Sequence, residues 1–190
     1  MTLTDRFTDA LVYAAQLHQA QVRKLSGTPY VAHLLRVAGI VLEHGADEDE
    51  AIAALLHDAV EDQGGEAARE GIRRQFGPRV AEIVDGCSDT DQTPKPPWRE
   101  RKTAYLARLT QASTSVRLVS AADKLDNARS LIESYHAQGE SIWEFFRGGR
   151  EGTLWYFHSV VEVLKRAGSN RLVEELDRAV TELDRVVAPP

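Results

Sequence analysis

The segment 51–62 constrains the fold more than any other part of the chain. Its first half, AIAALL, is apolar nearly all the way round, which is typical of a buried helix. Its second half places four ionisable residues within six positions: His57, Asp58, Glu61 and Asp62. Residues four apart share one helical face, so these groups meet in one region. Buried carboxylates cost on the order of several kcal/mol unless they are compensated, so the group needs a cation, a bound water network or solvent exposure, and a metal ion is the most specific of these explanations. A solvated helix end is the alternative.

The apolar pattern is helical almost everywhere and has no strand-like alternation of useful length, which predicts an all-α fold. We expect helices over about 4–20, 29–45, 47–64, 66–76, 78–87, 98–111, 114–136, 140–167 and 170–187. Thr28 is a natural N-cap with Pro29 at the first helical position, and this cap would fix where His33 points. Asp47 and Glu50 have the spacing of a capping box.

The length and composition suit one globular domain over 1–190, because 190 residues with 43% hydrophobic content can bury a substantial core. Residues 88–97, SDTDQTPKPP, carry three prolines and predict a mobile surface loop. We interpret this loop as a flap near a pocket rather than as a linker between domains.

Charge and cysteine content exclude several classes of protein. No basic, apolar leader opens the chain and no apolar run approaches about 18 residues, so we expect a soluble, cytoplasmic protein without membrane contact. A net charge of −6 argues against general nucleic-acid binding. The single cysteine, Cys87, excludes an internal disulfide and is expected in the core.

A second informative stretch is VSAADKLDNARSL at 119–131. On a helix Asp123 and Asn127 share one face, and the small residues before Asp123 allow close helix packing. With His33, His57 and Asp58, a carboxylate from this stretch gives two imidazoles and two carboxylates from three helices. That donor set suits Mn²⁺, Fe²⁺, Co²⁺ or Zn²⁺. Spacing alone does not select Asp123 over Asp126 or Asp85.

Four ordered blocks carry a resemblance to a known family: RKLSGTPYVAHLL, AALLHDAVEDQ, FGPRVAEIVDG and ADKLDNARSL. Over about residues 10–165 the chain resembles the hydrolase half of the RelA/SpoT family, and its length is similar to that of the small alarmone hydrolases. The resemblance implies a single HD-domain helical bundle, the metal-dependent phosphohydrolase fold, followed by a C-terminal helix at about 170–187. It also implies removal of the 3′-diphosphate from (p)ppGpp.

The resemblance further implies a role for each matching residue. One Mn²⁺ would be held by His33, His57, Asp58 and Asp123. Glu61 and Asp62 would act on the attacking water, and one of the two is expected to have a raised pKa because adjacent carboxylates do not ionise independently.

For the substrate, the resemblance implies Arg23 against the base, Lys24 and Ser26 lining the pocket, and Asn127 near the ribose. Tyr156 matches more loosely, through LWYFHSVVEVL. The partner would be a nucleotide, either ppGpp, pppGpp or an adenine alarmone. Arg101 or Lys102 could also hold phosphate, or could simply begin a solvated helix.

Several positions depart from the family pattern. Leu34 stands where the family usually has proline, Gln63 replaces a commoner threonine, and Asp126 stands where it usually has histidine. We expect Asp126 to add negative charge beside an anion site and to affect either the substrate preference or the orientation of Asn127. The other histidines are expected to be core or surface residues: His18, His44, His136 and His158.

Two other functions remain open from the sequence. One is an HD-type nucleotidase that acts on deoxynucleoside monophosphates, against which the RKLSG segment argues. The second is an antitoxin-like or alarmone-binding protein without catalysis, against which the Glu61–Asp62 pair argues.

Overall fold

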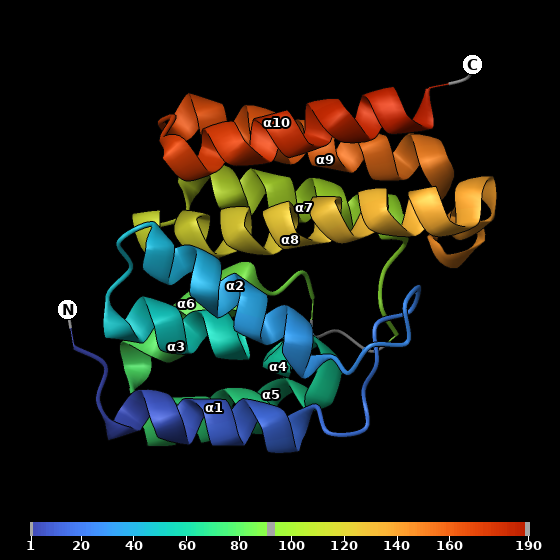
Figure 1. Ribbon diagram of the computed structural model, residues 1–190. Helices are drawn as coiled ribbons and strands as arrows, with labels where there is room; N and C mark the ends of the chain where they lie inside the picture. The colour runs from blue at the N-terminus through green and yellow to red at the C-terminus, as the bar shows by residue number, and fades with distance from the viewer. Residues whose placement is uncertain (1, 91–93, 189–190) are drawn as a thin grey trace.

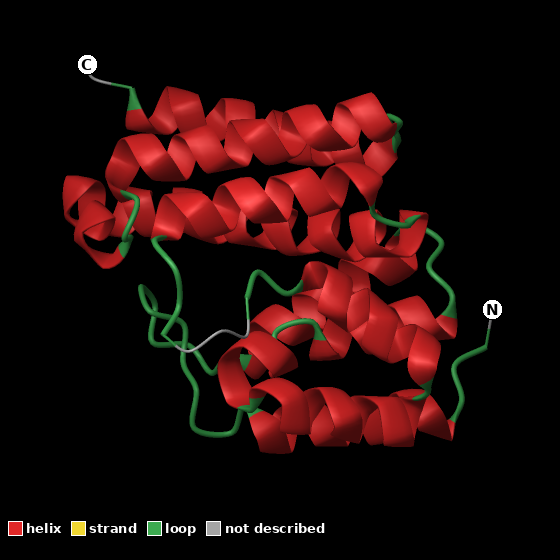
Figure 2. Cartoon of the chain, turned by 180° about the vertical axis from the view of Figure 1, so that it is seen from behind, coloured by secondary structure: helices red, strands yellow, loops and turns green. Residues whose placement is uncertain are grey.

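Helices account for almost all secondary structure in residues 2–90 and 94–188, the parts of the chain that the computed structural model describes (Figure 2). In chain order they are α1 (Asp5–Leu17), α2 (Val31–Glu43), α3 (Glu48–Leu56), α4 (Ala59–Gln63), α5 (Gly65–Phe76), α6 (Pro78–Cys87), α7 (Trp98–Gln111), α8 (Thr114–Gln138), the 3₁₀ helix η1 (Gly139–Phe145), α9 (Gly149–Ala167) and α10 (Arg171–Val187). Within these ranges there is no strand, only an isolated bridge between Val22 and Pro29. The predicted all-α fold is confirmed.

The helices are stacked in layers about α8, which has 25 residues (Figure 1). α9 and α10 pack on one side of α8, while α2, α3 and α6 pack on the other. Close approach depends on small residues, because α8 carries Ser120, Ala121 and Ala122 in a row, all of them buried. On α6, a Cβ at Gly86 would overlap the side chain of Val116. Asp123, which follows Ala122 on α8, therefore lies between the two layers.

The ends of several helices follow the local sequence. Asp47 accepts from the Glu50 N–H at 3.0 Å and Glu50 accepts from the Asp47 N–H at 2.8 Å, so the predicted capping box opens α3. Such a cap contributes about 1 kcal/mol. Pro78 starts α6, and the Asn170 side chain accepts from the Val173 N–H at the start of α10.

The predicted N-cap at Thr28 is wrong. α2 begins only at Val31, and its N-cap residue, Tyr30, makes no side-chain cap hydrogen bond. The segment before it folds back on itself: Tyr30 N–H donates to the Gln21 carbonyl at 2.9 Å, and Arg23 N–H donates to the Thr28 carbonyl at 2.8 Å. These hydrogen bonds close a turn in the segment 21–30, which the helix-capping propensities of Thr28 and Pro29 do not predict.

Two predicted helices are each interrupted. The helix expected over 47–64 breaks at His57 and Asp58. At this break His57 Nδ1 is hydrogen-bonded to the carbonyl oxygen of Ala54 at 2.8 Å. The helix expected over 140–167 divides into η1 and α9. A Cβ at Gly148 would lie 2.7 Å from the Trp98 indole, and Gly149 has φ +59°, so this break makes room for Trp98.

Two long connections, 18–30 and the described part of 88–97, lie at one edge of the molecule in both views (Figure 1 and Figure 2). Ser88 and Asp89 are buried, so the second connection begins inside the fold rather than on its surface. Residues 91–93 lie outside the described residues, and the predicted mobility of this loop stays a prediction. None of the described helices has the length and apolar character needed to cross a membrane.

Candidate active site

Two histidines and an aspartate form a compact group of metal-ligand types. His33 comes from α2, while His57 and Asp58 occupy the turn between α3 and α4. One ligand atom from each lies within 4.8 Å of the others, and the histidines are 0% and 2% exposed. Consecutive residues of an unbroken helix do not face each other. The break at this point lets His57 Nε2 and Asp58 Oδ2 approach to 3.0 Å.

Asp123 approaches the same group from α8. Its Oδ1 lies 3.3 Å from His33 Nε2 and 3.6 Å from His57 Nε2. Both Nε2 atoms are buried and, among the described residues, face these carboxylates without making a hydrogen bond of suitable geometry. Two imidazole nitrogens and two carboxylates that face one space are a donor set for a divalent transition metal. The residues present therefore fit a divalent ion.

The charges of these four groups are strongly coupled. Burial alone would lower the pKa of His33, but the nearby carboxylates of Asp123 and Asp126 outweigh it and raise the pKa to about 9. Burial alone would raise the pKa values of Asp58 and Asp123, yet the cations beside them hold both well below the ordinary range. The pKa of His57 is raised well above its ordinary value because the two carboxylates outweigh burial. A divalent cation can replace the imidazolium protons between these carboxylates.

Glu61 lies on α4 beside this group, and two residues of the connection 88–97 bind its carboxylate. Its Oε1 is 3.1 Å from Lys95 Nζ, and its Oε2 accepts from the Asp89 main-chain N–H at 3.3 Å. The connection therefore reaches the site, as expected for a segment near a pocket.

Asp62 follows on the same helix and accepts from Gln21 Nε2 at 2.8 Å. Burial raises its pKa, and the neighbouring charge of Asp58 raises it further. Asp62 is therefore a carboxylate with a raised pKa, as expected for one member of the pair.

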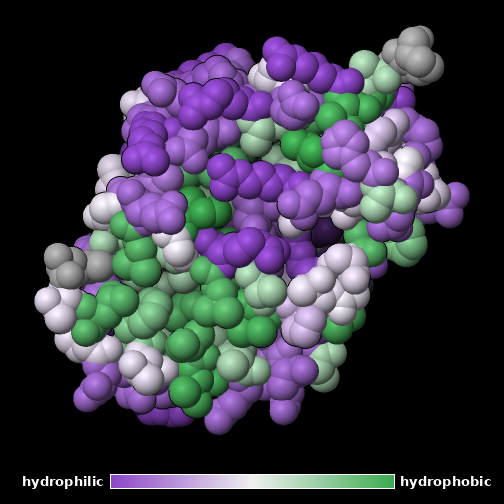
Figure 3. Space-filling model, viewed as in Figure 1, coloured by the Kyte–Doolittle hydropathy of each residue, from purple (hydrophilic) through white to green (hydrophobic). Residues whose placement is uncertain are grey.

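A cavity of about 910 Å³ opens beside the donor group, between α8 and the connection 18–30. It is visible as a hollow on the right of the surface in Figure 3. Its walls include all five residues expected to contact substrate and the two carboxylates of α4: Arg23, Lys24, Ser26, Asn127, Tyr156, Glu61 and Asp62. Asp58 and Asp123 also line it, so the donor group opens into the cavity.

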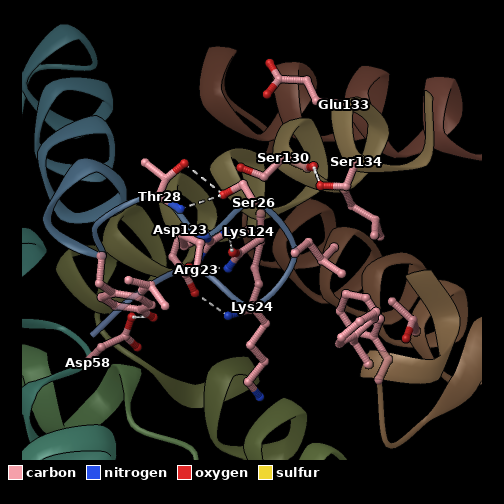
Figure 4. A pocket seen from close by; sticks show the side chains of 18 of the residues that line it. Arg23, Lys24, Ser26, Thr28, Asp58, Asp123, Lys124, Ser130, Glu133 and Ser134 are labelled. Atoms are coloured by element: carbon pink, nitrogen blue, oxygen red, sulfur yellow. Dashed lines mark hydrogen bonds and ion pairs between the residues drawn. The ribbon is translucent and has the colours of Figure 1, made fainter. Parts of the chain in front are cut away.

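The connection 18–30 supplies one wall of this cavity, opposite α8 (Figure 4). Arg23 Nη2 donates to Asn127 Oδ1 at 2.8 Å, and Asn127 Nδ2 donates to Asp123 Oδ1. The guanidinium of Arg23 also lies 5.8 Å from the centre of the Tyr30 ring. Arg23 and Asn127 are therefore tied to the donor group through a chain of hydrogen bonds. Ser26 Oγ is engaged in a local bond to Thr28 Oγ1 at 2.9 Å.

Tyr156, on α9, forms another part of the cavity wall. Its hydroxyl is buried and has no hydrogen-bond partner among the described residues, although the side chain lines the cavity. The ammonium groups of Lys102 and Lys124 lie 4.8 Å and 5.8 Å from the centre of its ring. This part of the wall therefore offers a hydroxyl donor and two nearby ammonium groups, which are suitable partners for an anionic ligand.

Arg101 does not begin a solvated helix. It is 8% exposed and pairs with Asp89, and Lys102 Nζ lies 2.7 Å from the same carboxylate. Arg101 does not line the cavity, whereas Lys102 does. Arg101 is buried because it pairs with Asp89, and the sequence did not reveal this pair because the two residues lie in different segments of the chain.

Asp126 is also placed differently from expectation. It is 2% exposed and does not line the cavity. Its carboxylate bonds to His33 Nδ1 at 2.6 Å and to Arg36, so its charge is compensated beneath the site rather than displayed at an anion pocket. Asn127 is oriented by other residues.

Sequence reasoning missed three residues of the site: Tyr30, Gln21 and His18. Tyr30 donates its hydroxyl hydrogen to Asp58 Oδ2 at 2.7 Å, and Gln21 holds Asp62. His18, expected as a core or surface residue, is 2% exposed, stacks on Tyr30 and bonds to Gln21 Oε1 at 2.6 Å. The one local signal was the position of Tyr30 three residues before His33. Of the other unassigned histidines, His136 and His158 are exposed and His44 is half-buried.

The HD domain family matches residues 10–154. A guanosine-3′,5′-bis(diphosphate) 3′-pyrophosphohydrolase, MESH1, from Drosophila melanogaster is 38% identical over 129 residues, which cover 66% of this chain and 69% of that protein. MESH1 from Xenopus tropicalis is 40% identical over 126 residues, 65% and 68% of the two chains. A solved structure described as a metazoan ortholog of SpoT that hydrolyzes ppGpp superimposes with a TM-score of 0.77 at 31% identity, over 97% of each chain.

Proposed function

The chain belongs to the HD domain family, and we propose that it is a hydrolase that removes the 3′-diphosphate from guanosine-3′,5′-bis(diphosphate) and related alarmones. The products would be a guanosine nucleotide with a free 3′-hydroxyl and pyrophosphate. The observation that carries the proposal is that a divalent-metal donor group, two further carboxylates and cationic side chains share one cavity.

The ligands proposed for the ion are His33, His57, Asp58 and Asp123, and the ion proposed is Mn²⁺, which accepts mixed nitrogen and oxygen donors. When bound, a divalent ion polarises a phosphoryl oxygen and lowers the pKa of water toward neutrality. The support for these ligands is the pair of buried Nε2 atoms that face two carboxylates and make no hydrogen bond within the described part of the chain.

Proton transfer is assigned to the two carboxylates of α4. Asp62 has a raised pKa and is fixed by Gln21, which suits a base that accepts a proton from the attacking water. Glu61, fixed by the Asp89 N–H and by Lys95, would orient that water. The water oxygen forms a bond to phosphorus, the bond from phosphorus to the ribose 3′-oxygen breaks, and the 3′-oxygen takes up a proton.

Substrate binding is assigned to the walls of the cavity. Arg23 would stack on the base, as its planar guanidinium permits, and Asn127 would contact the ribose. Lys24 and Ser26 would line the phosphate and base region, and the free hydroxyl of Tyr156 would donate to the nucleotide. Together these groups surround a dianionic or more highly charged ligand with hydrogen-bond donors.

Substrate profiling tests the function directly. Purified protein with Mn²⁺ is given ppGpp, pppGpp, an adenine alarmone and a 2′-deoxynucleoside monophosphate, and pyrophosphate and phosphate release are measured separately. We expect rapid pyrophosphate release from the alarmones and little reaction with the monophosphate, which has no 3′-diphosphate. Faster cleavage of the monophosphate would establish the nucleotidase function instead. Tight binding of ppGpp without turnover would establish a binding role.

The same assay tests the metal ligands. His57→Ala and Asp58→Ala should each lose bound Mn²⁺ and turnover together, because each removes a donor that water does not replace at equal affinity. Metal content is measured after dialysis. Stoichiometric Mn²⁺ with normal turnover in either variant would contradict the ligand assignment.

A further inference from the structure

The two histidines of the donor group are held in chemically different ways. His57 Nδ1 bonds to the neutral main-chain carbonyl of Ala54 at 2.8 Å. His33 Nδ1 bonds instead to the Asp126 carboxylate at 2.6 Å. A carboxylate partner fixes the tautomer and orientation of an imidazole and makes its other nitrogen a stronger donor. His33 is therefore the histidine with a charged partner behind it.

The Asp126 carboxylate is itself locked in place. Arg36 Nε donates to Oδ1, and Arg36 Nη2 donates to Oδ2 at 3.3 Å, so the guanidinium grips both oxygens. Arg36 follows His33 by three positions on α2, and Asp126 follows Asp123 by three positions on α8. Residues three apart share a helical face. The packing of α2 on α8 thus places Asp126 behind His33, on the side away from the donor group, while Arg36, which itself lines the cavity, holds Asp126 from α2.

From this geometry we propose that Asp126 is a positioning residue that aims His33 Nε2 into the donor group, and that Arg36 orients Asp126 for this task. The proposal rests on the metal-dependent function proposed above. Asp126 does not line the cavity, so it acts through His33 and not on the substrate. Asp126 thereby tunes the affinity of the site for its divalent ion.

Asparagine at this position is an informative substitution because it keeps the shape but replaces one oxygen with an amide donor. If the amide replaces Oδ1, it meets the Nε donor of Arg36. If it replaces Oδ2, it meets Nδ1–H of His33 as well as Arg36 Nη2. Either arrangement opposes a donor to a donor, so Asp126→Asn should disorder His33. Arg36→Gln in the same chain relieves the first conflict, because the amide of Asn at position 126 can then donate to the side-chain oxygen of the new glutamine.

The experiment measures Mn²⁺ affinity by calorimetry for the parent, Asp126→Asn, Arg36→Gln and the double variant. Loss of such a supporting contact typically weakens metal binding by about 10–100-fold, which is the loss expected for Asp126→Asn. Arg36→Gln should lose less, since the bond from Asp126 to His33 remains. The double variant should bind more tightly than Asp126→Asn alone. Arg36 has a side chain that is 47% exposed, so its substitution should not prevent folding if Asp126→Asn does.

A matched control lies at the other end of α2. His44 also bonds through Nδ1 to a main-chain carbonyl, and its Nε2 lies 3.4 Å from Glu175. Glu175→Gln removes a carboxylate beside a histidine that caps the same helix, and neither residue lines the cavity, so Mn²⁺ affinity should stay within twofold of the parent.

A second readout separates positioning from general stability. In the Zn²⁺-loaded parent, ¹⁵N spectra of the imidazoles should show His33 as the Nδ1–H tautomer, and Asp126→Asn should lose that single state. Mn²⁺ affinity within twofold of the parent and an unchanged His33 tautomer in Asp126→Asn would overturn the proposal. A parent that binds Mn²⁺ but leaves ppGpp intact would overturn the proposed function alone, because affinity and tautomer do not depend on turnover.

Discussion

Replacing Asp89 with alanine removes the carboxylate on which two cations converge. The Asp89 side chain is 4% exposed and pairs with Arg101, which is 8% exposed, and with Lys102, which is 18% exposed, at 2.7 Å. In the variant, Arg101 would keep only the Pro96 carbonyl, to which its Nε donates at 3.1 Å. A buried guanidinium would therefore lose its only counter-charge among the described contacts.

The magnitude follows from burial. Removing one partner of a buried ion pair costs about 3–5 kcal/mol. Lys102 lines the cavity and can turn toward water, and the Pro96 carbonyl still accepts from Arg101, so we expect the lower end, about 3 kcal/mol. For a chain of this size each kcal/mol lowers the melting temperature by about 2–4 °C, so the shift should be about 6–12 °C. Urea unfolding and thermal circular dichroism at pH 7 measure both quantities.

Asp177→Ala is the matched control, because its Oδ2 lies at the same 2.7 Å from Lys165 Nζ while the two side chains are 40% and 45% exposed. An exposed pair contributes less than about 1 kcal/mol. Equal losses of stability in the Asp89 and Asp177 variants would refute the reasoning, because burial would then not set the cost.

The same pair predicts a dependence on pH. Burial alone would raise the pKa of Asp89, but Lys102 and Arg101 outweigh it and hold the pKa below its ordinary value of 3.8. A carboxyl whose pKa is lowered by folding stabilises the protein above its unfolded pKa and loses that contribution as the pH falls through its folded pKa. The stability difference between the parent and Asp89→Ala should therefore be full at pH 5–7 and shrink as the pH falls below about 3.8.

Two further predictions concern the chemistry and the specificity. Replacing Glu61 with Gln and Asp62 with Asn together should leave ppGpp binding measurable by calorimetry but lower turnover by at least about a hundredfold, since proton transfer is lost; turnover within a few-fold of the parent would point to another base. Arg23→Ala should raise the KM for ppGpp and reduce the difference between guanine and adenine alarmones, whereas Lys24→Ala should weaken all polyphosphate substrates alike and lower the salt dependence of binding. The opposite pattern in steady-state kinetics at two ionic strengths would exchange the two assignments.

Local sequence was sufficient wherever neighbouring residues determine the structure. The capping box at Asp47 and Glu50, the start of α6 at Pro78 and the cap at Asn170 all form within a few residues of chain. The all-α class followed from the period of the apolar residues, which is set by burial of one helical face. His57 and Asp58 were selected because an apolar helix ending in carboxylates requires compensation.

Local sequence failed where distant segments compete for the same groups. Thr28 has the propensity of an N-cap, yet its carbonyl accepts from the N–H of Arg23 as the segment folds back, and α2 starts later. The helix expected over 140–167 breaks at Gly148 because the ring of Trp98, from another helix, occupies that space. Propensity describes one segment at a time and contains no information about such partners.

Three aspartates illustrate what the sequence alone determined and what only the tertiary structure decided. Spacing identified Asp85, Asp123 and Asp126 as equivalent carboxylates on helices, because helical position fixes only which face of its own helix a residue occupies. Packing separates them: Asp85 accepts from Arg69 Nε at 2.6 Å, Asp123 lies 3.3 Å from His33 Nε2, and Asp126 bonds to the opposite nitrogen of that ring. The sequence alone determines which residues carry a carboxyl group and which face of its helix each one occupies. The distance and direction between groups on different helices depend on how the helices pack.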